Sequence, residues 1–203
     1  MIKKLVVGAL ATNCYIIFDE NTKEAMVVDP GYEDERIIEF IKEEELKVKY
    51  IYLTHCHFDH IEGAEWLKIK VNAPIISLNL EDENLKDINI NLSKPITGYG
   101  FSVICDKLLF ENDEIEVGKY TFRVIHTPGH TSGSSSLYSE EFLISGDTIF
   151  SDTYGRVDFP TGNQNDMMKS IKNKLLLLPS ETIVYPGHGE STTIQKFSDL
   201  EVW

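Results

Sequence analysis

Seven short apolar runs, separated by turn residues, predict β-strands along the chain. They are residues 5–10, 14–18, 24–28, 50–53, 122–125, 142–144 and 182–185. The first three follow one another closely, with Asn and Asp residues between them, which is typical of consecutive antiparallel strands. The run at 50–53 has the length and composition of a buried strand. Strands are therefore expected in both halves of the chain.

Helical spacing of apolar residues predicts three helices between these strands. Residues 33–47 have acidic residues early and apolar residues on one face, a pattern that the helix dipole favours. A second helix is expected over 62–70. Asn163 is a candidate N-cap for a third, which Pro179 would end. The stretch 82–104 has no clear period and is expected to be a loop or flap near the functional site.

Composition predicts a single domain over residues 1–203 and limits its partners. No Pro/Ser-rich linker or charge block divides the chain. A domain of this length buries roughly 70% of the surface of the unfolded chain. The formal net charge of -14 and the pI near 4.8 disfavour a nucleic-acid partner, because phosphate binding depends on clustered Lys and Arg. A small-molecule substrate is expected instead.

Cysteine usage and the N-terminus predict a cytoplasmic protein. Cys14, Cys56 and Cys105 are odd in number and widely spaced, which fits a reducing compartment better than a disulfide framework. Residues 1–4 lead directly into the first predicted strand, without the long apolar segment of a signal peptide or membrane helix. We therefore expect no membrane partner.

The segment that follows the strand at 50–53 places four candidate metal ligands within six residues. In an extended stretch alternate side chains share a face, so His55 and His57 can bind one ion while Cys56 points away. Asp59 and His60, displaced in register, can reach a second ion close by. A carboxylate beside imidazole suits zinc, iron or manganese better than a structural thiolate site does.

Further candidate ligands follow three later strands, and they would complete the two shells. A lone His or Asp after a strand is usually a turn residue with a local hydrogen bond, but the combination favours metal binding. Pro128 and Gly129 exclude a helix that would put His126 and His130 on one face. We therefore expect only His130 to face the site and His126 to lie behind it or in the core. The other candidates are Asp147 and His188.

These motifs resemble those of a known family. The order His-x-His-x-Asp-His, Pro-Gly-His-Thr, Gly-Asp-Thr and Pro-Gly-His is similar to that of the metallo-β-lactamase superfamily, and within it to the glyoxalase II-like hydrolases. The likeness spans nearly the whole chain, and its first motif is highly specific. It implies an α/β fold, a four-layer αββα sandwich of two mixed sheets flanked by helices, with a dinuclear site at one edge.

The resemblance also implies a role for each residue of the motifs. It assigns the first ion to His55, His57 and His130, and the second to Asp59, His60 and His188. Asp147 would bridge the two ions. Asp29 matches a position that braces the site without binding metal, although an Asp before Pro is as readily explained as a plain turn residue.

Such a site predicts hydrolysis of a thioester or ester by a metal-bridging hydroxide. Two divalent ions, expected to be zinc with iron or manganese as alternatives, make hydroxide available at neutral pH. Asp59 or Asp147 would orient it. S-acyl-glutathiones such as S-lactoylglutathione are the substrates that the resemblance implies first, but only residues 189–203 follow His188, where longer relatives supply glutathione contacts.

Two substrate contacts and two other activities stay open from the sequence. Arg156 would clamp a substrate carboxylate or pair with Asp158, and Tyr154 is a weaker candidate for substrate binding. The first alternative is a lactonase. The second is a mononuclear iron persulfide dioxygenase, whose triad would be His55, His130 and Asp147. Metal count separates this dioxygenase from a dinuclear hydrolase.

Overall fold

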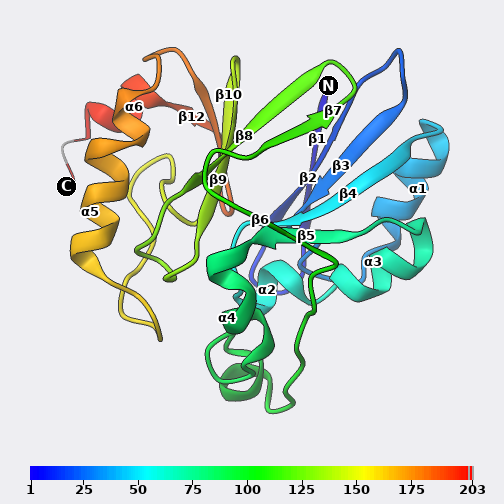
Figure 1. Cartoon of the computed structure of the whole chain (residues 1–203), viewed down its shortest axis with the longest axis horizontal. Coiled ribbons are helices and arrows are strands. Elements are labelled where there is room, and N and C mark those ends of the chain that lie inside the picture. The colour runs from blue at the N-terminus through cyan, green and yellow to red at the C-terminus, as the bar shows by residue number, and fades with distance from the viewer. Residues whose placement is uncertain (201, 203) are drawn as a thin grey trace.

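Two six-stranded mixed sheets face each other, with helices on their outer faces (Figure 1). The structure is a computed structural model and describes residues 1–200 and 202. The first sheet contains, in spatial order, β1 (Ile2–Val7), β2 (Thr12–Phe18), β3 (Glu24–Val28), β4 (Lys47–Leu53), β5 (Ile75–Leu78) and β6 (Lys107–Leu109). The order of the second is β12 (Thr192–Thr193), β11 (Ile183–Pro186), β10 (Phe142–Gly146), β9 (Ser135–Ser139), β8 (Tyr120–His126) and β7 (Glu114–Val117).

The strand directions confirm the expected α/β sandwich of mixed sheets. The first three strands pair antiparallel, and β3 to β6 pair parallel. In the second sheet β7 to β10 are antiparallel, while β10 and β11 run parallel. Parallel strands require crossover connections, and helices of these connections cover the sheets. The longer helices are α1 (Glu35–Glu43), α3 (Ala64–Val71) and α5 (Gln164–Asn173); the shorter ones are α2 (Phe58–Ile61), α4 (Asp82–Lys86) and α6 (Ile194–Ser198).

Three hydrophobic clusters hold the four layers together. Strand β2 shows how one strand supplies two of them, because alternate side chains point to opposite faces. Cys14 and Ile16 pack beneath α1 and α3, whereas Tyr15 and Ile17 lie between the sheets. A third cluster joins the second sheet to α5 and α6. Both faces of β2 are therefore buried, which explains why its sequence is a continuous apolar run.

Several element boundaries differ from the sequence expectation. The first strand ends at Val7 because Gly8 turns the chain with φ +66°. The first helix covers Glu35–Glu43 instead of 33–47: Glu45 takes a left-handed conformation and Lys47 already begins β4. These changes follow from local backbone conformations that hydrophobic spacing does not report.

The third expected helix has the predicted start and an earlier end. Asn163 caps α5, with its side-chain oxygen accepting a hydrogen bond from the Asp166 N–H. The helix ends at Asn173, and a 3₁₀ turn, η3 (Leu175–Leu177), precedes Pro179. The stretch 82–104 is not a plain loop, since it contains α4 and a π-helical turn, η2 (Ser93–Thr97). Among the described residues, no helix is long and apolar enough to cross a membrane.

Candidate metal centre

The expected ligands lie on loops that follow four strands and come together at one edge of the sandwich. The segment after β4 carries the first motif, and the loops after β8, β10 and β11 carry the three later ones. Backbone bonds tie these loops to one another. The Ser135 N–H donates to the Thr54 carbonyl, and the Gly187 N–H donates to the Gly146 carbonyl. These bonds bring together ligands that are far apart in the sequence, such as His55 and His188.

A first cluster of ligand atoms comes from His55, His57 and His130. All three rings are buried, and their potential ligand atoms lie within 4.8 Å of one another. Nδ1 of His57 lies 2.8 Å from Nε2 of His130. The ring centroids of His55 and His130 are 4.8 Å apart. Three imidazoles converging on one point form a set that zinc or iron accepts.

A second cluster contains Asp59, His60 and His188, and Asp147 lies between the two clusters. Nε2 of His60 is 3.2 Å from Nε2 of His188, and Oδ2 of Asp59 is 3.3 Å from the latter atom. Asp147 oxygens lie 3.5 Å from His60 and from His130. Tetrahedral ligands about 2.0–2.1 Å from one ion are about 3.3 Å from each other. The spacing therefore fits ligands around an ion.

A layer of hydrogen bonds behind the rings sets their orientation. Asp29, held in a left-handed conformation at φ +50°, accepts bonds from the Thr54 N–H and hydroxyl and from Nδ1 of His60. Nδ1 of His130 lies 2.7 Å from the Arg156 carbonyl and donates to it. Each bond occupies Nδ1 and leaves Nε2 facing the other ligand side chains, an arrangement that is typical of metal-binding histidines. Asp29 thus contacts the site from behind.

Burial and neighbouring charges separate the histidines into two kinds. Burial and the adjacent imidazoles lower the pKa of His55 and His57, so these rings stay neutral and keep a lone pair. Burial also acts to lower the pKa of His60, but the carboxylates of Asp147, Asp59 and Asp29 raise it to about 10. Burial opposes ionisation of Asp59, yet His60 and His188 hold the pKa of Asp59 below its usual range. Asp59 therefore carries a negative charge that a cation would compensate.

Unpaired buried atoms support the fit to metal ions. Nε2 of His55 and Oδ1 of Asp147 are fully buried without a hydrogen-bond partner. An unsatisfied buried polar atom is costly, and such atoms are rare in folded proteins. Gly187 adds a second indication, because a Cβ there would lie against Oδ1 of Asp147 and the His60 ring. The backbone approaches this closely only where the residue has no side chain. These clusters are able to hold metal ions.

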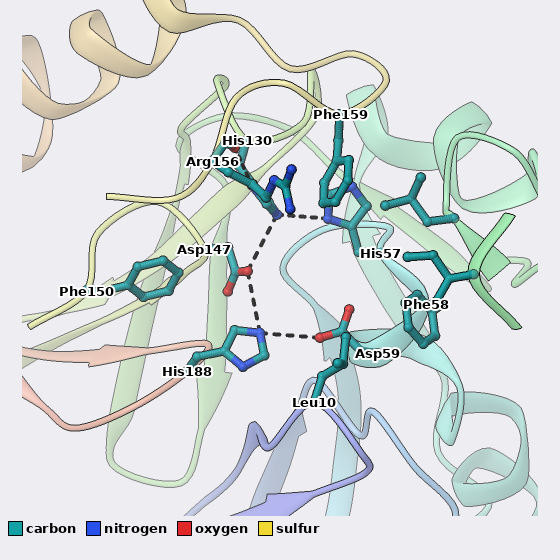
Figure 2. Close-up of a pocket in the computed structure, with 12 residues that line it drawn as sticks. Leu10, His57, Phe58, Asp59, His130, Asp147, Phe150, Arg156, Phe159 and His188 are labelled. Carbon is teal, nitrogen blue, oxygen red and sulfur yellow. Dashed lines mark hydrogen bonds and ion pairs between the residues drawn. The ribbon is translucent and has the colours of Figure 1, made fainter. Parts of the chain in front are cut away.

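A cavity of about 510 Å³ opens over the clusters (Figure 2). His57, Asp59, His130, Asp147 and His188 line its floor. The remaining wall consists of one arginine and six apolar side chains: Arg156, Leu10, Phe58, Leu92, Ile96, Phe150 and Phe159. Leu92 and Ile96 come from the stretch expected to form a flap. This stretch therefore borders the site although it is partly helical.

Three predicted residues lie outside the clusters. His126 is half-buried instead of part of the core, and its Nε2 is 2.9 Å from the Ser132 carbonyl. Arg156 borders the cavity and forms two bonds of 2.7 Å to Asp158. The Tyr154 hydroxyl accepts a bond from Gln164 and does not line the cavity. Of the two arginine roles expected from the sequence, the structure contains the pairing with Asp158.

Sequence reasoning missed one buried acid that connects the ligand loops. The Glu81 carboxylate is fully buried and accepts bonds from the Cys56 N–H (2.8 Å), the Thr131 hydroxyl (2.6 Å) and the Asn84 amide (2.6 Å). Cys56 lies between two histidines of the first motif, and Thr131 follows His130. Because acids occupy positions 81–83, the sequence has the appearance of a solvated helix start. Cys56 packs into the core, as expected.

Comparison with known proteins finds similar sequences and similar solved structures. The family model described as metallo-beta-lactamase superfamily matches residues 7–188. The hydroxyacylglutathione hydrolase GloC of Haemophilus influenzae is 34% identical, over 95% of this chain and 92% of its own. A solved structure of the BLEG-1 B3 metallo-beta-lactamase is 38% identical with a TM-score of 0.92, covering 98% of this chain and 97% of its own. ETHE1 from Myxococcus xanthus is 29% identical with a TM-score of 0.79, covering 97% and 80%. The names of these relatives differ, so they leave the reaction open.

Proposed function

The chain belongs to the metallo-beta-lactamase superfamily, and from this premise we propose that it is a dinuclear metal-dependent hydrolase of thioester or ester bonds. The observation that carries the proposal is the pair of ligand clusters with Asp147 between them. Asp147 reaches towards His130 of one cluster and towards His60 and His188 of the other at 3.5–3.6 Å. A site for a single ion would not require the second set of ligands.

Each cluster supplies three protein ligands, the number typical of a catalytic metal site that keeps a position open for water. His55, His57 and His130 would hold the first ion, Asp59, His60 and His188 the second, and Asp147 would bridge them. Mixed imidazole and carboxylate donors suit zinc, which we propose, and iron or manganese as alternatives. Ions bound there would supply a hydroxide nucleophile at neutral pH and polarise the substrate carbonyl.

The side chains around the ions position the reactants. Thr12 donates to Oδ2 of Asp59 at 2.9 Å, which fixes this carboxylate with its other oxygen turned towards the cavity (Figure 2). In this position Asp59 can orient a nucleophilic water. The depressed pKa of Asp59, held down by His60 and His188 against the effect of burial, keeps the carboxylate ionised, so that it can accept a hydrogen bond from this water. No protein nucleophile is needed.

A mononuclear iron dioxygenase acting on persulfides is the second candidate. The likeness to ETHE1 favours it, and the triad of His55, His130 and Asp147 would suffice for one iron. The two candidates differ in what they require of His188. A dinuclear hydrolase needs this ligand, whereas a mononuclear dioxygenase leaves it without an ion.

One experiment separates the candidates. Protein purified without added metal is analysed for metal content and assayed with a thioester, an ester, a lactone and a persulfide. We expect about two ions per chain and hydrolysis that His188→Ala abolishes. His126→Ala is the matched control, because its ring lies outside both clusters. One iron per chain and persulfide-dependent oxygen uptake that survives His188→Ala would replace the hydrolase with the dioxygenase. Exclusive turnover of the lactone would make it a lactonase.

A further inference from the structure

We infer that the substrate group held by this cavity is an uncharged apolar acyl chain, carried by a leaving group without the charges of glutathione. This inference rests on the proposed hydrolase function and specifies its substrate class. It comes from the cavity wall above the metal-binding floor. That wall differs sharply in chemistry from the floor.

Six apolar side chains from separate parts of the chain form most of the wall. They are Leu10 of the β1–β2 turn, Phe58 of α2, Leu92 and Ile96 at η2, and Phe150 and Phe159 of the segment after β10. In Figure 2, Phe150 and Phe58 lie on opposite sides of the ligand side chains. Apolar pockets with a few polar groups at one end are typical of sites that bind apolar ligands.

Two of these side chains are exposed although they are aliphatic. Leu10 and Ile96 are each 52% exposed, at the cavity. Exposed apolar side chains that gather at one site, beside a polar centre, are typical of a surface that a ligand covers. An acyl chain leaving the metal-binding floor would cover both. The wall therefore supplies contact area along a path away from the reacting carbonyl.

The charges of the wall do not suit glutathione. A glutathione thioester carries two carboxylates and an ammonium group, and carboxylates are bound most strongly by unpaired arginines. Arg156 is the sole cation among the lining residues that the structure describes. Its guanidinium is engaged by Asp158 through two bonds and lies 3.8 Å from the centre of the Phe159 ring. The arginine therefore presents a neutralised pair to the substrate.

The test compares chain length and leaving group in separate series with the metal-loaded enzyme. The first series contains N-acetylcysteamine thioesters of acetyl, butyryl and hexanoyl groups. Each buried methylene is worth roughly 0.8 kcal/mol, so kcat/KM should rise about fourfold per methylene while the wall is being filled. The second series compares hexanoyl-N-acetylcysteamine with hexanoylglutathione and with S-lactoylglutathione. We expect the uncharged thioester to have the highest kcat/KM.

A charged substitution in the wall provides the structural control. Ile96→Lys should flatten the chain-length dependence and raise the relative activity towards the glutathione thioesters. Ile69→Lys is the matched variant, because Ile69 is more exposed and does not line the cavity. It should leave both series unchanged. A preference for S-lactoylglutathione with no chain-length dependence would overturn the inference and leave the hydrolase intact. Absence of turnover with every thioester and ester would overturn the hydrolase itself.

Discussion

Replacing Glu81 should loosen the metal centre without touching a metal ligand. The carboxylate receives three hydrogen bonds, and two of the donors belong to segments that carry first-cluster histidines. In Glu81→Ala the Cys56 N–H loses its only acceptor among the described residues. Thr131 keeps its contact with Ser134, and Asn84 keeps Ser132. One buried donor is therefore orphaned and two others lose one bond each.

The size of the effect follows from these bonds. An orphaned buried donor costs about 1–3 kcal/mol, and each lost bond about 1 kcal/mol. Removing the carboxylate also removes the cost of burying it, which offsets part of this sum. We therefore expect Glu81→Ala to lower the free energy of unfolding by about 3 kcal/mol. Weaker support of the ligand loops should reduce metal affinity about 10- to 100-fold, as for other groups that orient ligands.

Glu81→Gln is the matched control because it keeps an acceptor for Cys56 and Thr131. Its amide would face Asn84, which a flip of the Asn84 amide can accommodate. Denaturant unfolding and competition with a chromophoric chelator measure the two quantities. Equal stability and metal affinity of Glu81→Ala and the wild type would refute the connecting role. If Glu81→Gln lowers stability and metal affinity as much as Glu81→Ala does, the charge of Glu81 is required and its hydrogen bonds alone are not sufficient.

The same pair of proteins tests the protonation of Glu81. Burial raises its pKa above the usual 4.5, and the bonds from Thr131, Asn84 and Cys56 offset this only in part. A carboxyl group whose pKa is higher in the folded state binds its proton more tightly there than when unfolded. Its contribution to stability therefore falls as the pH rises above about 4.5. As the pH rises above about 4.5, the free energy of unfolding of the wild type should fall relative to that of Glu81→Gln. A difference between the two proteins that does not change with pH would contradict the raised pKa of Glu81.

Three further substitutions test the site. Gly187→Ala should raise the dissociation constant for metal about 10- to 100-fold, because overpacking against Asp147 costs about 1–3 kcal/mol. Calorimetric titration with zinc measures this constant. An unchanged constant would mean that the backbone at residue 187 moves to accommodate the methyl group. Asp147→Asn should lower kcat about 100-fold or more while the thermal midpoint stays near that of the wild type, because the amide compensates less of the charge. Asp158→Asn should free Arg156 and raise kcat/KM for glutathione thioesters several-fold, whereas the uncharged thioester should be unaffected.

Local sequence determined the parts of this protein that depend on neighbouring residues. The capping of α5 by Asn163 requires only a side chain next to a helix start, so the sequence was sufficient to predict it. The first motif is equally local, since the spacing of His55, His57 and His60 needs only a strand end and a turn. Strand positions followed from apolar runs because both faces of β2 are buried.

Element ends were harder to predict, because single backbone conformations decide them. The left-handed residue Glu45 separates α1 from β4, and nothing in the hydrophobic spacing indicates that break. The same is true of the stretch 82–104, where a short helix and a π-helical turn form without a clear period. Contacts with the rest of the fold stabilise these two short elements, although the local sequence has little intrinsic preference for helix.

Only the tertiary structure decided what surrounds the metal-binding floor. Glu81 lies among acids in the sequence and becomes a buried acceptor because β5 ends beside the ligand loops. Leu10, Ile96 and Phe159 are far apart along the chain, and no local pattern relates them, yet they share one cavity wall. Contacts between distant segments depend on how the layers pack. The ligand types can therefore be read from the sequence, while the apolar wall emerges only when the two sheets and their loops come together.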